Sequence, residues 1–402
     1  MTTVIDWALV LLGLPSLGAG LYLLTMTLLW RRPTDVRGRQ SRLRFCLLVP
    51  AHNEEAGIAS TVHSLQAIDC PVGLRRIVVI ADNCTDATAS VARTAGAEVI
   101  ERFDDARRGK GFALRDAIDT LLVEDASQPA WDAMVVVDAD TVVEPNLLHV
   151  LAAHFEAGAS VVQAAYLPRR GTRGPIGVIT YVAFVAIHLV RSAARERLGL
   201  SCGLRGNGMA FRRDVLRDVP HAAFSRTEDL EFGVMLGLQG VRVAFAGETR
   251  VYGEMPDRPA AVASQRERWI GGRSGIARRF VGTLLRGAIG QRSLMLADLA
   301  VDLMVPALSV VTVVAAVGLT ASLALSAAVG VFTTSLAVWS IAFAGLAIHV
   351  AHAARISGQG RALLAAATAI PGYALDKTAI ALRMLRHSDE TWVRTPRKEE
   401  NL

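Results

Sequence analysis

The stretch Met134-Val135-Val136-Val137-Asp138-Ala139-Asp140 joins an apolar run to two acidic residues. Because near-continuous valine-rich runs are typical of strands covered on both faces, Met134–Val137 predicts a buried β-strand. Asp138 and Asp140 follow where this strand ends, and two carboxylates so placed offer oxygen ligands to a hard divalent cation. Such a cation would bridge the phosphates of a nucleotide diphosphate, which carboxylates alone repel.

Further apolar runs predict strands of the same sheet, and helical stretches separate them between residue 45 and about residue 250. This alternation indicates an α/β domain with a Rossmann-like, mostly parallel sheet and helices on both faces. The additional predicted strands are Phe45–Val49, Ile77–Ala81, Glu98–Glu101 and Val161–Ala165.

Polar residues also follow the first two of these strands, as Ala51-His52-Asn53-Glu54 and as Asp82-Asn83. Ligands of parallel sheets bind at the carboxyl ends of the strands, so polar clusters at three strand ends predict one shared site. Each cluster alone has a structural explanation, because Asp and Asn commonly cap helices. A Gly-x-Gly-x-x-Gly motif does not follow the first strand, which argues against a dinucleotide-binding site.

A basic, glycine-containing turn supplies the complementary charge. Residues 107–111 read Arg-Arg-Gly-Lys-Gly and begin a predicted helix that extends to about Val123. The glycines allow a close approach to the backbone, Lys110 adds positive charge, and a helix N-terminus favours anions. The alternative is a solvated basic turn without a ligand.

Two clusters lie further along the chain. Residues 225–229 read Ser-Arg-Thr-Glu-Asp, and the Ser-x-x-Glu spacing is that of a helix capping box. Asp229 would be a general base if it faced the cleft. Gln265, Arg268 and Trp269 share one helical face, which suits a phosphate beside a sugar ring, although an amphipathic surface helix is the alternative.

Composition places part of the chain in a membrane. The 402 residues exceed one ordinary domain. Hydrophobic residues make up 52% and charged residues 20%, which excludes a disordered chain and argues against a purely soluble enzyme. The four cysteines, without C-x-x-C spacing, indicate neither a disulfide scaffold nor a zinc site.

The uncharged segment from Trp7 to Trp30 is long enough to span a bilayer, so residues 1–30 are predicted to form a transmembrane helix. A cleaved signal peptide is disfavoured because a basic segment does not precede it. Residues 31–44 form an arginine-rich linker, which places the following domain in the cytoplasm by the positive-inside rule. Much of the basic excess, a net charge of +6, then belongs to the membrane surface, and no nucleic-acid partner is predicted.

A second uncharged segment, residues 303–354, is predicted to form two transmembrane helices, with a buried helical hairpin as the alternative. Between the spans we expect a catalytic domain over residues 45–290 and an interfacial segment over residues 291–302. Residues 355–402 are predicted to form an interfacial helix and a cytoplasmic tail, because the run Ala362–Leu375 is too short to span. The prediction is a multi-pass cell-membrane protein with three spans, with Pro175–Leu189 counted as an interface segment.

The order of these motifs resembles that of the membrane-embedded family 2 glycosyltransferases, the group that contains cellulose, hyaluronan and poly-N-acetylglucosamine synthases. The resemblance covers roughly residues 45–280 and a tail motif. Its residues are Val49-Pro50-Ala51-His52-Asn53-Glu54, Asp82, Gly109-Lys110-Gly111, Asp138-Ala139-Asp140, Thr227-Glu228-Asp229, Gln265-Arg266-Glu267-Arg268-Trp269 and Thr391-Trp392-Val393-Arg394-Thr395. The resemblance implies a glycosyltransferase-A fold, a nucleotide-sugar donor that is usually a UDP-sugar, and Mg²⁺ or Mn²⁺.

The resemblance also implies a role for each motif. The turn with Ala51, Asn53 and Glu54 would hold the base and ribose together with Asp82. Asp138 and Lys110 would complete the nucleotide-sugar site, and Asp140 would ligate the metal. Asp229 would be the catalytic base. The residues implied at the diphosphate and acceptor end are Gly206, Asn207, Glu228, Gln265, Arg268 and Trp269.

The resemblance implies an inverting transfer to a saccharide acceptor at the membrane, with β-glycan synthesis as the first expectation. Transfer of one sugar to a lipid, as in ceramide glucosyltransferase-like enzymes, is the alternative. Three spans give a monomer little with which to enclose a polysaccharide channel, so a homo-oligomer remains an expectation under the first reading. The rival classes are a nucleotidyltransferase and a non-catalytic membrane scaffold.

Overall fold

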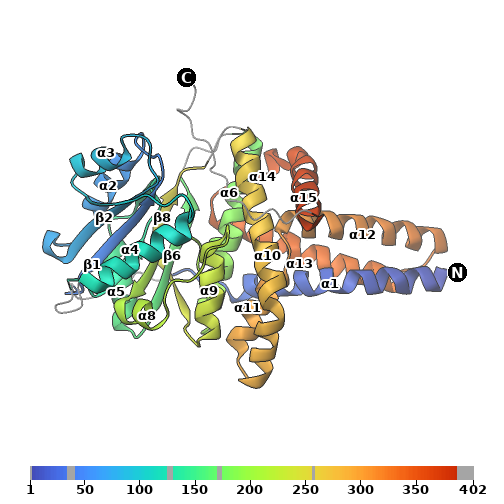
Figure 1. Ribbon diagram of the computed structural model, residues 1–402. Coiled ribbons are helices and arrows are strands. Elements are labelled where there is room, and N and C mark those ends of the chain that lie inside the picture. The colour runs from blue at the N-terminus through green and yellow to red at the C-terminus, as the bar shows by residue number, and fades with distance from the viewer. Residues whose placement is uncertain (1, 34–40, 125–129, 170–173, 256–258, 387–402) are drawn as a thin grey trace.

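The computed structural model describes residues 2–33, 41–124, 130–169, 174–255 and 259–386. The tail motif Thr391–Thr395 therefore lies outside the described residues. A sheet with flanking helices forms one part of the molecule, and long apolar helices project from one side of it as a second part (Figure 1).

The sheet contains eight strands in the order β3-β2-β1-β4-β7-β6-β8-β5. Neighbours from β3 to β4 are parallel, β7 is antiparallel to both of its neighbours, β6 and β8 are parallel, and β5 is antiparallel to β8. The α/β class is thus confirmed, with a mixed sheet. The strands are β1 Phe45–Ala51, β2 Arg75–Asp82, β3 Glu98–Arg102, β4 Ala133–Val136, β5 Thr141–Val143, β6 Val161–Pro168, β7 Met209–Arg212 and β8 Val243–Gly253.

All five predicted strands are present as β1, β2, β3, β4 and β6. The sequence analysis missed β5, β7 and β8. The first two of these contain only three and four residues, too few to produce a periodic pattern. The much longer β8 follows the apolar end of α9 after residues 239–242, and its second half alternates between buried and half-buried residues.

Strand alternation divides the core between the two faces of the sheet, because successive side chains of a strand point to opposite sides. In β1, Leu47 and Val49 join one buried cluster, whereas Cys46 and Leu48 join the other. Short helices cover both faces. They are α2 Ile58–Gln66, η1 Val72–Leu74, α3 Thr88–Thr94, α4 Lys110–Glu124, α5 Leu147–Glu156, α8 Arg213–Asp218 and α9 Glu228–Leu238.

Four helices in the described residues are long and apolar enough to cross a membrane. Three of them, α1 Thr2–Leu29, α12 Leu308–Val329 and α13 Thr334–Ile356, match the predicted spans closely. The fourth covers Gly174–Arg197 and is one more than the sequence analysis counted. It consists of α6 Gly174–Phe184, the π-helical segment η2 Val185–Arg191 and α7 Ser192–Arg197, and it is more deeply buried within the protein than the other three.

Small residues hold α1 and α13 together. A Cβ atom on Gly20 or on Gly345 would collide with the backbone of the opposite helix, so the two backbones are in direct contact. Asp6 of α1 also accepts a hydrogen bond from the backbone N–H of Ser335, at 2.9 Å, in the first turn of α13.

The remaining helices lie between the sheet and the long helices or beside the latter. They are α10 Pro259–Gly290, α11 Leu294–Met304, α14 Gly360–Ala365, η3 Ala367–Ala369 and α15 Ile370–Arg386. In Figure 1, α10 and α11 run across the direction of α1, α12 and α13. The predicted interfacial segment 291–302 corresponds to most of α11, and its position at a membrane surface stays a prediction.

Candidate active site

The residues that are predicted to bind the nucleotide sugar lie together at the carboxyl ends of three neighbouring strands. Strand β1 lies between β2 and β4, and Ala51 is in register with Ala81. Asp82 ends β2, and Asp138 follows β4 by two residues. The three clusters that the sequence analysis placed at strand ends are therefore neighbours.

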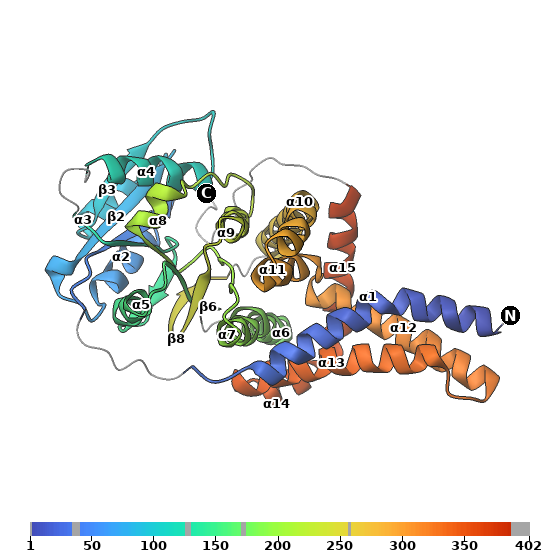
Figure 2. The ribbon, with the colours of Figure 1, turned by 90° about the horizontal axis from the view of Figure 1, so that it is seen from below.

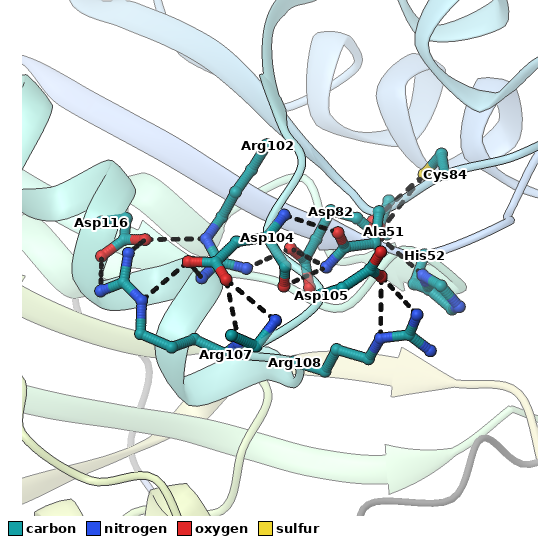
Figure 3. A network of polar contacts seen from close by, with 12 residues as sticks. Ala51, His52, Asp82, Cys84, Arg102, Asp104, Asp105, Arg107, Arg108 and Asp116 are labelled. Carbon is teal, nitrogen blue, oxygen red and sulfur yellow. Dashed lines mark hydrogen bonds and ion pairs between the residues drawn. The ribbon is translucent and has the colours of Figure 1, made fainter.

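Asp82 is buried and forms an ion pair with Arg102, with 2.7 Å between Nη1 and Oδ1. Arg102 also contacts Asp116 at 2.8 Å and Asp104 at 3.3 Å (Figure 3). Burial raises the pKa of Asp82, although the Arg102 guanidinium opposes this shift. The sequence analysis missed Arg102. Its signal was its position at the end of β3, in register with Asp82 on the parallel neighbour.

The turn that follows β1 is bonded to the turn that follows β2. Asn53 has a positive φ of 53°, and its Oδ1 accepts a hydrogen bond from the Thr85 N–H at 2.8 Å. The Glu54 N–H donates to the Thr88 hydroxyl at 2.7 Å. Ala51, Asn53 and Glu54 thus lie on the Asp82 side of the site.

Lys110 is the first residue of α4, and its side chain contacts three parts of the site. Its Nζ lies 2.5 Å from Asp138 Oδ1, 2.6 Å from the Gly206 carbonyl oxygen and 3.6 Å from Glu228 Oε1. Burial lowers the pKa of Lys110, but the carboxylates of Asp138 and Glu228 outweigh it and the net shift is upward. Lys110 is therefore an ammonium that holds together residues from three separate motifs.

The other cations of the basic turn have different partners. Arg107 contacts Asp104 at 2.7 Å and Asp116 at 3.3 Å, and Arg108 pairs with Asp105 (Figure 3). The reading as a solvated basic turn thus fits Arg107 and Arg108, which are largely exposed, but not Lys110.

Gly206 and Asn207 connect the two carboxylate motifs. The fully buried Asn207 accepts a hydrogen bond from the Asp138 N–H at 3.2 Å and donates one to the Thr141 hydroxyl at 2.8 Å. Gly206 has a φ of +83°, and a Cβ atom there would lie 3.2 Å from Asp229 Oδ2. The loop predicted ahead of the Thr-Glu-Asp motif therefore contacts it.

Glu228 and Asp229 are the first two residues of α9. The capping box that offered a structural explanation is not formed, because the buried Ser225 hydroxyl has no hydrogen-bond partner among the described residues and Thr227 is the N-cap. Burial raises the pKa of both carboxyl groups, and Lys110 opposes this shift. Both carboxyl groups are therefore buried under the influence of the Lys110 ammonium.

Tyr166 on β6 links these acids to the Gln-x-x-Arg-Trp helix. Burial raises its pKa, and the carboxylates of Asp138, Asp140 and Asp229 add to the increase while Arg268 opposes it. These four charged groups therefore all lie close enough to act on the Tyr166 phenol. The sequence analysis did not select Tyr166, and its placement among buried apolar residues of a strand gave no signal.

Trp269 and Tyr166 belong to one aromatic cluster, which Phe184 connects. Its ring centroid lies 5.6 Å from that of Phe184, which lies 5.8 Å from Tyr166. A Cβ atom on Gly272 would lie 2.6 Å from the Thr227 side chain, so α10 packs directly on the turn before α9. Gln265 lies one turn before Trp269 on α10.

Asp138 and Asp140 suit a metal ion whose other ligands come from a substrate. No three His, Cys, Asp or Glu side chains in the described part of the chain could hold a metal ion by themselves. Mg²⁺ usually binds through one or two protein carboxylates together with substrate phosphates. Asp138 pairs with Lys110, and Asp140, two residues further along the chain, is the metal ligand that the resemblance implies.

Comparison with known proteins agrees with this geometry. The model of the family described as "Glycosyltransferase like family 2" matches residues 43–272, more than half of the chain. A mannosyltransferase from Pyrobaculum calidifontis, crystallised with GDP-mannose and Mn²⁺, covers 88% of this chain and 98% of its own with a TM-score of 0.57. At 18% identity, this likeness shows a shared glycosyltransferase-A-type fold.

Two curated relatives match part of the chain. The beta-monoglucosyldiacylglycerol synthase of Synechocystis sp. is 28% identical over 56% of this chain and 47% of its own length. The uncharacterized glycosyltransferase YaiP of Escherichia coli is 26% identical over 61% of each chain. The matched segments thus span about half to three fifths of these relatives. On the matching family model and the shared fold, the chain belongs to glycosyltransferase family 2.

Proposed function

We propose that this protein transfers a sugar from a nucleotide-sugar donor, a UDP-sugar, to a lipid acceptor at the membrane, with inversion of configuration. The observation that carries the proposal is the contact of Lys110 with Asp138, Gly206 and Glu228, which joins donor-side and acceptor-side motifs in one cluster. A nucleotidyltransferase would not need the adjoining helix with Arg268 and Trp269.

The donor side would hold the nucleotide. In this proposal Ala51, Asn53, Glu54 and Asp82 contact the base and ribose, while Asp138 and Lys110 contact the sugar diphosphate. Asp140 would hold Mg²⁺ or Mn²⁺, which supplies Lewis-acid stabilisation of the departing diphosphate when it is bound. The Mn²⁺ and GDP-mannose in the mannosyltransferase crystal support this choice of ligands.

The acceptor side would carry out the proton transfer. Asp229 takes the proton from an acceptor hydroxyl while the hydroxyl oxygen forms a bond to the anomeric carbon. The bond from that carbon to the diphosphate oxygen breaks, and its electron pair leaves with the diphosphate. Because attack and departure occur on opposite faces of the ring, the configuration inverts. Gly206, Asn207, Glu228, Gln265, Arg268 and Trp269 would position the acceptor and the diphosphate.

Transfer to a lipid is placed ahead of polymer synthesis because of the relatives. One is named for a glucosyldiacylglycerol product, and another, 28% identical over 36% of this chain, is the 4,4'-diaponeurosporenoate glycosyltransferase of Staphylococcus aureus. Polysaccharide synthesis, the first expectation from the sequence, remains the second candidate on the strength of its motifs. We further propose that the sheet domain is cytoplasmic and that α1, α12 and α13 span the membrane.

The test uses the full chain in lipid vesicles with a panel of UDP-sugars. We expect one donor to release UDP and to yield a lipid that carries a single sugar, detected by mass spectrometry. Asp229→Asn should reduce UDP release at least 100-fold, in the range of general base catalysis, while the protein stays folded. A ladder of products would instead support the polymer, and normal turnover by Asp229→Asn would remove this residue from the mechanism.

A further inference from the structure

Four arginine residues lie close together between the sheet and the C-terminal end of α1. Arg191 and Arg195 belong to the buried Gly174–Arg197 helix, Arg205 lies in the loop before Gly206, and Arg273 lies on α10. The surrounding elements α7, α11 and the inner end of α1 come together on the side of the sheet domain that faces the long helices (Figure 2). The proposed mechanism uses none of these arginines.

Two carboxylates of α11 face this cluster. Arg195 contacts Asp298 and Asp302, each at 2.9 Å. Arg191 also pairs with Asp302, and Arg273 lies 3.6 Å from it. One carboxylate, Asp302, is thus shared by three guanidinium groups.

The cluster has more positive than negative charge. Four guanidinium groups face the two carboxylates of α11, and Asp229 is a further carboxylate that acts on Arg205. Arg205 forms no ion pair within the described residues, and its side chain donates to the Cys202 carbonyl at 2.9 Å. Arg195 is fully buried, and its Nη1 has no hydrogen-bond partner there; Arg191 Nε and Arg205 Nε are buried in the same way. Burial, followed by the neighbouring guanidinium groups, lowers the pKa of Arg205 to about 10 and that of Arg273 to about 9.

Arg191 and Arg195 are buried, and Arg205 and Arg273 are half-buried. An excess of positive charge in such a place is costly unless an anion compensates it. Guanidinium groups bind phosphate oxygens through paired N–H donors, and unpartnered N–H groups are available in this cluster. A phosphate monoester carries a charge of about −1.5 to −2 at neutral pH, which would compensate the excess of guanidinium groups over the carboxylates of α11.

The position of the arginine cluster indicates which chemical group is attached to the bound anion. At one end, Arg205 adjoins Gly206, which packs against Asp229. At the other end, Arg195 donates to the Tyr22 hydroxyl at 2.6 Å, and Tyr22 lines an apolar cavity of about 350 Å³. This cavity is also lined by Met26 of α1, by Leu198, Leu200 and Leu294, and by Asp298, the partner of Arg195. Its size is typical of small-molecule sites.

From this arrangement we propose that the arginine cluster and the cavity form a binding site for a long-chain lipid phosphate monoester. The arginines hold the phosphate, the cavity holds the start of the chain, and the phosphate end is directed toward Asp229. A neutral lipid would leave the charge uncompensated, and free phosphate would leave the apolar cavity unused. That the lipid is the acceptor rests on the proposed function, whereas the binding site does not.

Binding is measured on the full chain in a neutral detergent at about 0.15 M salt, which screens non-specific surface charge. The probes are dodecyl phosphate, dodecanol and inorganic phosphate. We expect saturable binding of one dodecyl phosphate per chain, at least tenfold tighter than either other probe. Equal affinity for inorganic phosphate would overturn the lipid site in favour of a free-anion site.

Variants locate the two ends of the site. Arg205→Gln and Arg273→Gln should each weaken dodecyl phosphate binding at least tenfold, while Arg286→Gln, an exposed position on the same helix as Arg273, should not. Leu198→Trp should fill the cavity and weaken dodecyl phosphate binding with the arginines intact; Leu198 is 45% exposed, so the variant should fold.

Unchanged affinity in Arg205→Gln, Arg273→Gln and Leu198→Trp, each with the melting temperature of the wild type, would overturn the site, as would an equal loss in Arg286→Gln. Turnover is a separate readout. If dodecyl phosphate binds as proposed but no UDP-sugar glycosylates it, the site stands and its identification with the acceptor fails.

Discussion

At the scale of single residues, the site depends on cations that lie far from their partners in the sequence. Lys110 contacts Asp138, Gly206 and Glu228, and Arg102 holds the buried Asp82. The acids were predicted because strand ends collect ligands. Arg102 was not predicted, because its position at the end of β3 points to Asp82 only once the register of β2 and β3 is known.

The buried His221, at the edge of the site, is expected to make the stability of the fold sensitive to acid. His221 is 3% exposed, and its Nδ1 lacks a hydrogen-bond partner among the described residues. Burial, with a smaller effect of Lys110, lowers its pKa to about 4 from 6.5. The unfolded chain therefore binds the proton first, so stability is complete above pH 6.5 and falls as the pH drops toward 4.

The expected loss is about 1.4 kcal/mol per pH unit over this interval, or about 3 kcal/mol in total. The melting temperature in detergent should fall between pH 7 and pH 5, and His221→Leu should reduce this fall. His63→Leu, at an exposed position on α2, is the matched control and should behave like the wild type. Identical acid sensitivity in His221→Leu and the wild type would contradict the assignment.

At the scale of elements, the active site depends on close packing of α10 on the turn before α9. Gly272 faces Thr227, whereas a Cβ atom on Gly275 of the same helix would meet nothing within 4 Å. Ala normally stabilises a helix over Gly by about 1 kcal/mol, so Gly275→Ala should be neutral or slightly stabilising. Gly272→Ala should push Thr227, shift Asp229 and lower the rate of UDP release about tenfold or more.

The comparison of UDP release with melting temperature for these two variants checks this prediction. If Gly272→Ala were as active as Gly275→Ala, the packing of α10 on the turn before α9 would not control the geometry of the site.

At the scale of the whole molecule, the sequence predicts the long apolar helices well, because length and hydropathy alone define such candidate spans. The Gly174–Arg197 helix was missed as a candidate span since it contains Arg191 and Arg195. Their partners Asp298 and Asp302 lie about a hundred residues later, on α11. Pairing between distant elements thus made a charged helix compatible with burial, and periodicity cannot reveal such pairing.

The central claim is that the strand-end carboxylates and the α10 residues converge on one metal-bound nucleotide diphosphate. Calorimetric titration of UDP into the full chain, with and without Mn²⁺, tests it most directly, using wild type, Asp140→Asn and the exposed control Asp214→Asn. We predict that Mn²⁺ tightens UDP binding at least tenfold in the wild type and in Asp214→Asn but not in Asp140→Asn. Full Mn²⁺ enhancement in Asp140→Asn would contradict the account.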